Sequence, residues 1–212
     1  MSRISIILGV LLSVTLILAV WISTTTAQEI ENLLTNPDFE ADTGNWTIGA
    51  GATFIIDKKE KFPVGQVAKA QIDNPGANNW EPEIHSPTVN LMNNKKYTYS
   101  FWAKTEPGKT KSISSCFEQN NPVWAGAGAI NITLTDQWVE YTATGVWATA
   151  TPSVVIHIAL NYPPTHLLDV WFAHFRVYEG DYVKDKIDLE MKPKAVTPGE
   201  KLASSWGEIK SR

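Results

Sequence analysis

YTYSFWAKT, residues 97–105, predicts a β-strand whose two faces differ in character. Successive side chains of a strand point to opposite sides, so the stretch divides into two sets. The apolar set is expected to face a core and comprises Tyr97, Tyr99, Phe101 and Ala103. The other set is polar with a single large ring and comprises Thr98, Ser100, Trp102 and Lys104. A polar face with one ring suits a surface that stacks on a flat ligand.

Short stretches with strand character precede and follow this one. They cover residues 52–57, 65–72, 112–117, 130–134, 138–146, 154–160 and 169–178. Turn-forming residues separate them, and no useful helical period occurs before Tyr178. Short strands at near-regular spacing predict an all-β fold, an antiparallel β-sandwich.

Composition predicts one ordinary globular domain. The chain has 212 residues, a formal net charge of -4, 19% charged residues and 43% hydrophobic residues. This mild acidity argues against nucleic acid as a partner, because nucleic-acid binding calls for a basic stripe. Cys116 is the only cysteine, which excludes an intrachain disulfide, and its place within a strand pattern predicts a buried, inert thiol.

The N-terminus has the pattern of a targeting segment. Arg3 gives a positive start, residues 4–22 are apolar, and small residues end at Ala27. We expect a signal peptide over residues 1–27 and a secreted or cell-surface domain. The apolar run also approaches the roughly 20 residues that span a bilayer, so an uncleaved membrane anchor is the alternative.

The composition changes after Glu179, where residues 180–212 become charged and lose the strand pattern. We expect the folded domain to cover residues 28–179 and the rest to form a tail outside it. Leu202, Trp206 and Ile209 have helical spacing, which suits a helix that docks on a protein partner or carries an anchoring signal. A tail folded against the domain is the alternative.

Five stretches in order carry a resemblance to a known family. They are NLLTNPDFEADTGNW at 32–46, NNWEPEI at 78–84, KKYTYSFWAKT at 95–105, TDQWVEYT at 135–142 and VWFAHFRVYE at 170–179. Over about residues 30–179 the chain resembles the carbohydrate-binding modules of families 4, 9 and 22. The resemblance implies a jelly roll of the galactose-binding-domain-like kind. It also implies non-catalytic binding of a β-linked polysaccharide or oligosaccharide, often beside a secreted glycoside hydrolase.

The resemblance also bears on metal binding and on the core. Many such modules carry a structural calcium ion, and Glu40 matches one of its ligand positions. The last strand departs from the family, with Ala173 and His174 where aspartates are usual. Calcium prefers six to eight oxygen ligands, so this departure predicts a weakened or absent site. No other cofactor is implied. The family match assigns three tryptophans to packing: Trp46, Trp138 and Trp171.

Sugar binding requires flat apolar surface together with a few well-placed polar groups. The candidate ligand-binding residues are Trp80, Trp102, Trp124, Gln119 and His157, with Glu118 of the same standing as Gln119. Each has an alternative as a packing or surface residue, because aromatic side chains dominate protein cores.

Two other functions remain open at this stage. A glycosidase needs two carboxylates across a cleft, and Glu81, Glu83, Glu118 and Glu140 are available, but none lies in a recognisable catalytic motif. We therefore expect no enzymatic activity. A structural or adhesion module, attached through its C-terminal tail, is the second alternative.

Overall fold

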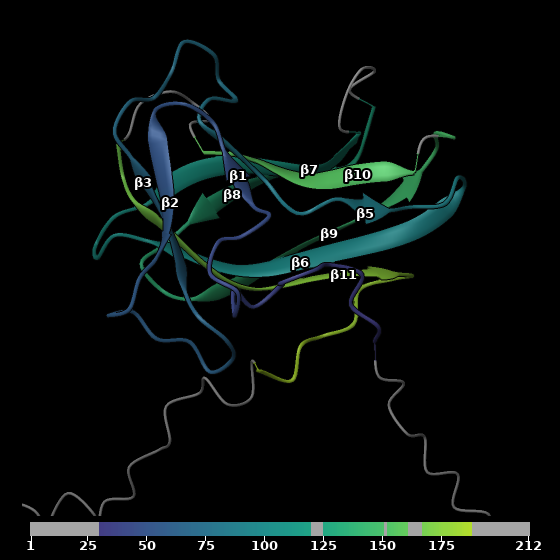
Figure 1. The fold of residues 1–212 in the computed structure, drawn as a ribbon, viewed down its shortest axis with the longest axis horizontal. Coiled ribbons are helices and arrows are strands. Elements are labelled where there is room, and N and C mark those ends of the chain that lie inside the picture. The colour runs from purple at the N-terminus through teal and green to yellow at the C-terminus, as the bar shows by residue number, and fades with distance from the viewer. Residues whose placement is uncertain (1–29, 120–124, 151, 161–166, 188–212) are drawn as a thin grey trace, which may run out of the picture. The chain divides into compact units, whose positions relative to one another are not determined.

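Two antiparallel β-sheets pack face to face across one apolar core in the computed structural model (Figure 1). The structure describes residues 30–119, 125–150, 152–160 and 167–187. The expected signal peptide, Trp124 and residues 188–212, with the expected docking helix, lie outside the described residues. Within them, no helix is long and apolar enough to cross a membrane.

The first sheet, here called the β7 sheet, has the strand order β1-β4-β10-β7-β8, with β5 paired to β10. Its strands are β1 (Thr47–Ile48), β4 (Glu83–His85), β5 (Val89–Asn90), β7 (Lys111–Gln119), β8 (Gly126–Leu134) and β10 (Ser153–Ala159). The second, the β6 sheet, has the order β2-β3-β11-β6-β9. Its strands are β2 (Ala52–Ile56), β3 (Ala68–Ile72), β6 (Lys95–Thr105), β9 (Val139–Trp147) and β11 (Val170–Glu179).

Side-chain alternation produces the core between the sheets. On β6 the apolar set of YTYSFWAKT is buried as predicted, with Tyr99 and Phe101 fully inaccessible to solvent. Phe101 stacks on Phe175 of β11 at 5.0 Å between ring centroids. From the facing sheet, Ile113 and Phe117 of β7 complete the contact. The predicted antiparallel β-sandwich is confirmed.

Three short strands that the sequence patterns did not predict form because their residues pair with neighbouring strands. The short strands β1, β4 and β5 lie in segments that we expected to be loops or left unassigned. β8 begins at Gly126, earlier than expected, and contains a bulge opposite Ser115 and Phe117. Gly128 has φ 62° in this bulge, a conformation that glycine adopts without a steric penalty.

The outer face of the β6 sheet is covered by the chain itself, which overturns the expectation of an exposed Trp102. Its side chain is only 3% exposed and packs in a second apolar cluster with Phe62 and Ile187. The centroids of the Phe62 and Trp102 rings lie 5.5 Å apart. Trp138 and Trp171 pack partly buried against this cluster, whereas Trp46 joins the main core. The face that we predicted as a ligand platform is therefore an interior surface.

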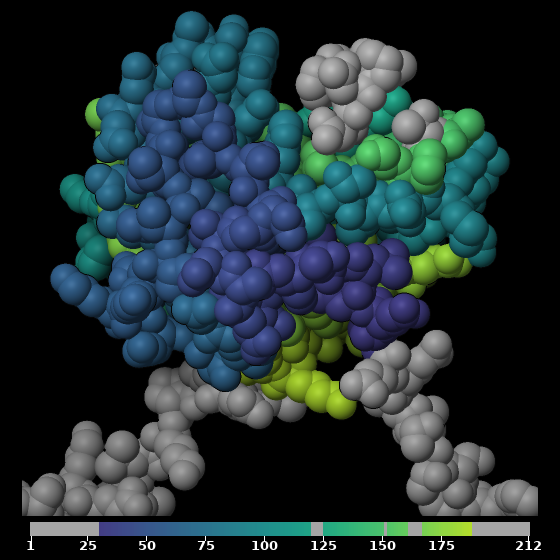
Figure 2. Space-filling view, viewed as in Figure 1, coloured from purple at the N-terminus to yellow at the C-terminus, as the bar shows by residue number. Residues whose placement is uncertain are grey.

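The packed chain continues past Glu179, where the tail was expected to begin. The Tyr182 hydroxyl donates a hydrogen bond of 2.6 Å to Glu140, and Asp185 and Ile187 are buried. The N-terminal segment also lies along the last strand, since the N–H of Leu33 donates to the Val177 carbonyl at 2.8 Å. Figure 2 shows this purple N-terminal segment beside the yellow-green C-terminal residues.

Candidate functional site

The outer face of the β7 sheet is partly open and polar, unlike that of the β6 sheet. Alternation places the apolar residues of β7 and β10 in the core and turns the intervening residues outward. The partly or fully exposed members of this face are Glu83, His85, Ser112, Ser114, Cys116, Glu118, Asn131, Thr133 and His157. A surface with both donors and acceptors suits the hydroxyl groups of a sugar.

Strand register arranges these side chains in rows across the sheet. His157 lies opposite His85 on one side and Cys116 on the other. In the next row Ala159 lies between Glu83 and Ser114. Because alanine is small, this second row leaves space above the sheet.

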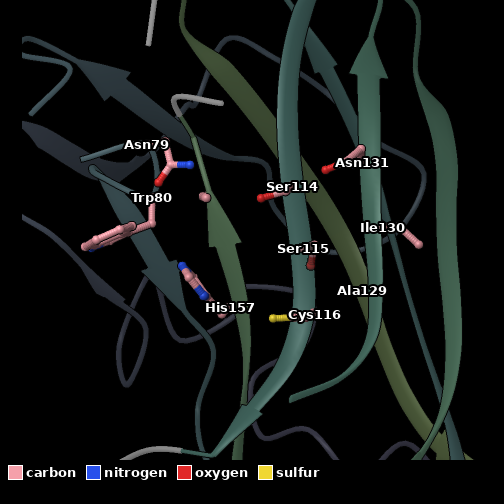
Figure 3. Close-up of a pocket in the computed structure, with 10 residues that line it drawn as sticks. Asn79, Trp80, Ser114, Ser115, Cys116, Ala129, Ile130, Asn131 and His157 are labelled. Atoms are coloured by element: carbon pink, nitrogen blue, oxygen red, sulfur yellow. The ribbon is translucent and has the colours of Figure 1, made fainter. Parts of the chain in front are cut away.

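A cleft of about 300 Å³ opens over these rows. Its wall on one side is Trp80 with Asn79, and on the other side it is Asn131 with Ile130 (Figure 3). The remaining lining residues are Ser114, Ser115, Cys116, Ala129, His157 and Ala159. Trp80 keeps 47% of its surface exposed, so a large apolar ring is available beside polar groups. This combination is what a sugar ring requires.

Glu81 fixes the loop that carries Trp80. Its carboxylate accepts hydrogen bonds from the N–H groups of Ala77 at 2.8 Å and Asn78 at 3.2 Å. These bonds, of which the one from Ala77 has the largest effect, hold the pKa of Glu81 below its usual value. Gly76 has φ 75°, and a Cβ atom there would lie 2.4 Å from the Glu81 Cβ. The loop conformation therefore needs glycine at position 76.

His157 sits between two carboxylates. Its Nδ1 atom pairs with Glu118, and its Nε2 atom lies 3.2 Å from Glu83. Burial lowers the pKa of His157, but Cys116 and the two carboxylates outweigh burial and raise it to about 11. The imidazoles of His157 and His85 lower the pKa of Glu83 to about 2. The face therefore carries charged groups held in fixed positions at neutral pH.

The structure brings together two of the five predicted ligand-binding residues, Trp80 and His157. Trp102 lies buried on the other sheet. Gln119 is 2% exposed and belongs to the core-facing set of β7, so it does not reach the cleft as a predicted ligand-binding residue should. Cys116 is partly exposed and lines the cleft, in contrast to the expected burial.

Ser114 and Asn131 are cleft residues that the sequence reasoning missed. They are directly paired across β7 and β8. The spacing of Ser112, Ser114 and Cys116 around Ile113 and Phe117 was a usable signal that β7 has a polar outer face. Nothing in that pattern, however, indicates which strand lies beside β7.

The carboxylates considered for a glycosidase do not form a catalytic pair. Glu81 is occupied by the N–H groups of its own loop, and Glu83 lies against two imidazoles. Glu140 belongs to the other sheet, where it pairs with Arg176. Only Glu118 remains beside the cleft, and it pairs with His157.

The residues present do not fit the calcium site that the family resemblance implies. Glu40 is exposed and belongs to neither group of potential metal ligands among the described residues. Nearby, Asp38 Oδ1 lies 2.6 Å from His174 Nδ1, and Asp185 Oδ2 lies 3.0 Å from His174 Nε2. The imidazole thus engages both carboxylates.

Comparison with known proteins places the sandwich among binding modules. A family model described as a carbohydrate binding domain, CBM_4_9, matches residues 31–165. A search of curated proteins found no match.

Several solved structures have a similar fold. One titled "CBM4 structure and function" aligns with a TM-score of 0.56 and 22% identity, covering 69% of this chain and 99% of its own. The CBM22-1 xylan-binding domain of Paenibacillus barcinonensis Xyn10C aligns with 0.53 and 14%, covering 74% and 99%. The CBM22-1–GH10 modules of Clostridium thermocellum xylanase 10B, complexed with xylohexaose, align with 0.51 and 13%, covering 70% and 28%. At these identities the likeness concerns the fold.

Proposed function

This chain belongs to the carbohydrate binding domain family that matches residues 31–165, a family of non-catalytic binding modules, and we propose that its ligand is a β-linked polysaccharide or oligosaccharide. The ligand would lie in the cleft on the outer face of the β7 sheet. One observation carries this assignment: the half-exposed ring of Trp80 stands beside a floor of small and polar side chains.

The chemistry of the cleft supports an extended, neutral sugar chain. Trp80 supplies a flat apolar surface for the C–H face of one ring. Ser114 can donate and accept, and the Asn131 amide does both in a fixed plane, so together they match hydroxyl pairs. Two of the structural neighbours are titled as a xylan-binding domain and a xylohexaose complex, which makes xylan the first polysaccharide to test.

Affinity electrophoresis and titration calorimetry with xylan, cellulose oligosaccharides, laminarin and mixed-linkage glucan test this proposal. At least one β-linked glycan should retard the protein, and Asn131→Ala should weaken that binding. Val146→Ala is the matched control, because Val146 is exposed on β9 of the other sheet. Absence of binding across the panel, or equal loss in both variants, would contradict the proposal.

We also propose that the protein is exported. The apolar run at residues 4–22 and the small residues that end at Ala27 support a cleaved signal peptide. Intact mass measurement of the protein recovered from its producing cells tests this. A mature chain that begins at Gln28 is the expected result, and retention of residues 1–27 in a membrane fraction would favour the uncleaved anchor.

A further inference from the structure

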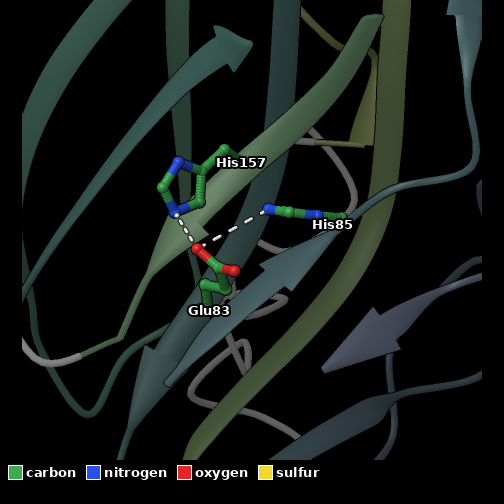
Figure 4. A group of neighbouring side chains, drawn as sticks. All are labelled: Glu83, His85 and His157. Carbon is green, nitrogen blue, oxygen red and sulfur yellow. Dashed lines mark ion pairs between the residues drawn. The ribbon is translucent and has the colours of Figure 1, made fainter. Parts of the chain in front are cut away.

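Glu83, His85 and His157 form a compact cluster on two neighbouring strands of the β7 sheet. Glu83 and His85 project from the same face of β4, and His157 projects beside them from β10. Figure 4 shows the Glu83 carboxylate directed at both imidazole rings. The ring centroids lie 5.2 Å apart and the planes are nearly perpendicular, at 88°. The three side chains therefore converge on one small volume.

The spacing of the three donor atoms fits one tetrahedral metal ion. Glu83 Oε2 lies 3.7 Å from His85 Nε2 and 3.2 Å from His157 Nε2. Bonds of about 2.0–2.1 Å around tetrahedral zinc place neighbouring ligand atoms roughly 3.4 Å apart. The observed separations lie on either side of this value, and the donor atoms of the two imidazoles lie within 4.8 Å of each other. The three side chains would need to move little to coordinate an ion.

Both imidazole nitrogens that face Glu83 are buried and make no hydrogen bond of normal geometry. Within the described residues, Nε2 of His85 and Nε2 of His157 are inaccessible to solvent, and each has only the Glu83 carboxylate as an ion-pair partner, at 3.7 Å and 3.2 Å. Native structures rarely leave buried polar atoms without well-formed hydrogen bonds. A metal ion bound by both nitrogens and by Glu83 would give each of these atoms a bond of normal geometry.

Glu118 supplies the supporting contact that metal-binding histidines usually have. It pairs with His157 Nδ1, on the opposite side of the ring from Glu83. Histidine ligands commonly donate their second N–H to a carboxylate, which fixes the tautomer and orients the ring. Here that contact leaves Nε2 directed at the cluster.

We propose that Glu83, His85 and His157 bind a divalent transition-metal ion, best represented by Zn²⁺, with Glu118 as the carboxylate that orients His157. Two imidazoles and one carboxylate suit zinc, whereas calcium requires oxygen ligands. Three protein ligands leave a fourth position for water. This site goes beyond carbohydrate binding and does not depend on it.

A second possible metal site shares His157 with the first, and the experiment below distinguishes the two sites. Cys116, Glu118 and His157 also hold donor atoms within 4.8 Å of one another. That arrangement contains a single imidazole and uses Glu118 as a ligand, so no carboxylate is left to orient His157. The Glu83 cluster offers two imidazoles and keeps Glu118 as the orienting carboxylate, so it is the better site.

Titration calorimetry of the metal-free full chain with ZnCl₂ tests the site. One equivalent of Zn²⁺ is expected to bind and to raise the melting temperature. His85→Gln and Glu83→Gln should each weaken binding at least tenfold, and Glu118→Gln should weaken it roughly tenfold to a hundredfold. Cys116→Ser is the matched control and should bind as the parent does.

Three results would overturn the proposal. The first is that the parent chain takes up no Zn²⁺. The second is that His85→Gln binds Zn²⁺ with unchanged affinity while its metal-free melting temperature also stays unchanged. Loss of binding in Cys116→Ser with retention in Glu83→Gln would assign the ion to the Cys116 group instead.

Discussion

His174 Nδ1 lies 2.6 Å from Asp38 Oδ1, so an ion pair ties the last strand to the N-terminal segment. The other nitrogen of the same ring pairs with Asp185, which follows the last strand. His174 has φ 45° and lies at the bulge where the pairing of β11 with β6 shifts register. One side chain therefore joins the last strand to the N-terminal segment and to the segment that follows the strand.

Replacing His174 should destabilise the fold. His174→Gln removes one of the two positive charges that compensate buried Asp185 and leaves only Arg176, and an incompletely compensated buried charge is costly. We expect a loss of roughly 2–4 kcal/mol in the free energy of unfolding, measured by urea denaturation. Asp181→Asn, which removes the exposed partner of Lys96, is the control and should cost less than about 1 kcal/mol. Equal effects of the two variants would refute this role for His174.

The same cluster predicts how stability depends on pH. Burial lowers the pKa of His174, but Asp185 and Asp38 outweigh it and raise the pKa from 6.5 to about 9. This contribution is complete below pH 6.5 and is lost as the pH rises through about 9. Burial raises the pKa of Asp185, but His174, the Ile187 N–H and Arg176 outweigh burial and lower the pKa from 3.8 to about 2. That contribution is lost as the pH falls through about 2.

Melting temperatures measured from pH 3 to pH 10 check this dependence. The charged groups that face the cluster are Asp38, Asp185, Arg176 and, through Arg176, Glu140. Between pH 6.5 and 9 the parent chain should lose stability more steeply than His174→Gln. Parallel curves for the two proteins would show that His174 does not titrate as described.

Calcium should not stabilise the protein. An ion that binds only the native state raises its stability in proportion to RT ln(1 + [L]/Kd). Because His174 engages Asp38 and Asp185, adding millimolar CaCl₂ to metal-free protein should leave the melting temperature unchanged. A clear increase with CaCl₂ would restore the site at Glu40. ZnCl₂ under the same conditions serves as the contrasting addition.

Local patterns were sufficient to predict the sandwich, because alternation within a strand is a property of neighbouring residues. Tyr99 and Phe101 are buried as the pattern of YTYSFWAKT indicates. The burial of Trp102, by contrast, is determined by residues outside its own strand. It depends on Phe62, in an earlier loop, and on Ile187, beyond the last strand, and both cover it. No periodicity within residues 97–105 contains that information.

Local sequence patterns also predict only part of the candidate site. His157 points away from the core because alternation along β10 determines that direction, which a local sequence pattern is sufficient to indicate. Its neighbours His85 and Cys116 come from β4 and β7 through pairing between strands. The departure at His174 was visible in the sequence, but its pairing with Asp185 required a segment that we had assigned to a tail.

Trp80 and Trp102 should respond oppositely to replacement by alanine. Trp80→Ala removes a half-exposed ring from the cleft, so glycan affinity should fall roughly fivefold to thirtyfold with little change in stability. Trp102→Ala should cost about 3–5 kcal/mol of stability because it creates a cavity in a packed cluster. Its folded fraction should bind glycan normally. Calorimetry and denaturation on both variants separate the two roles, and normal affinity in Trp80→Ala would move the site elsewhere.

Gly76→Ala tests whether the loop positions Trp80. Alanine is strained at φ 75°, and its Cβ would meet the Glu81 side chain, so the loop must rearrange. We expect glycan affinity to fall as far as in Trp80→Ala, although the ring is still present. Gly108→Ala is the matched control, because Gly108 also has positive φ but a Cβ there meets no atom within 4 Å. Full affinity in Gly76→Ala would mean that Trp80 reaches the ligand without the support of Glu81.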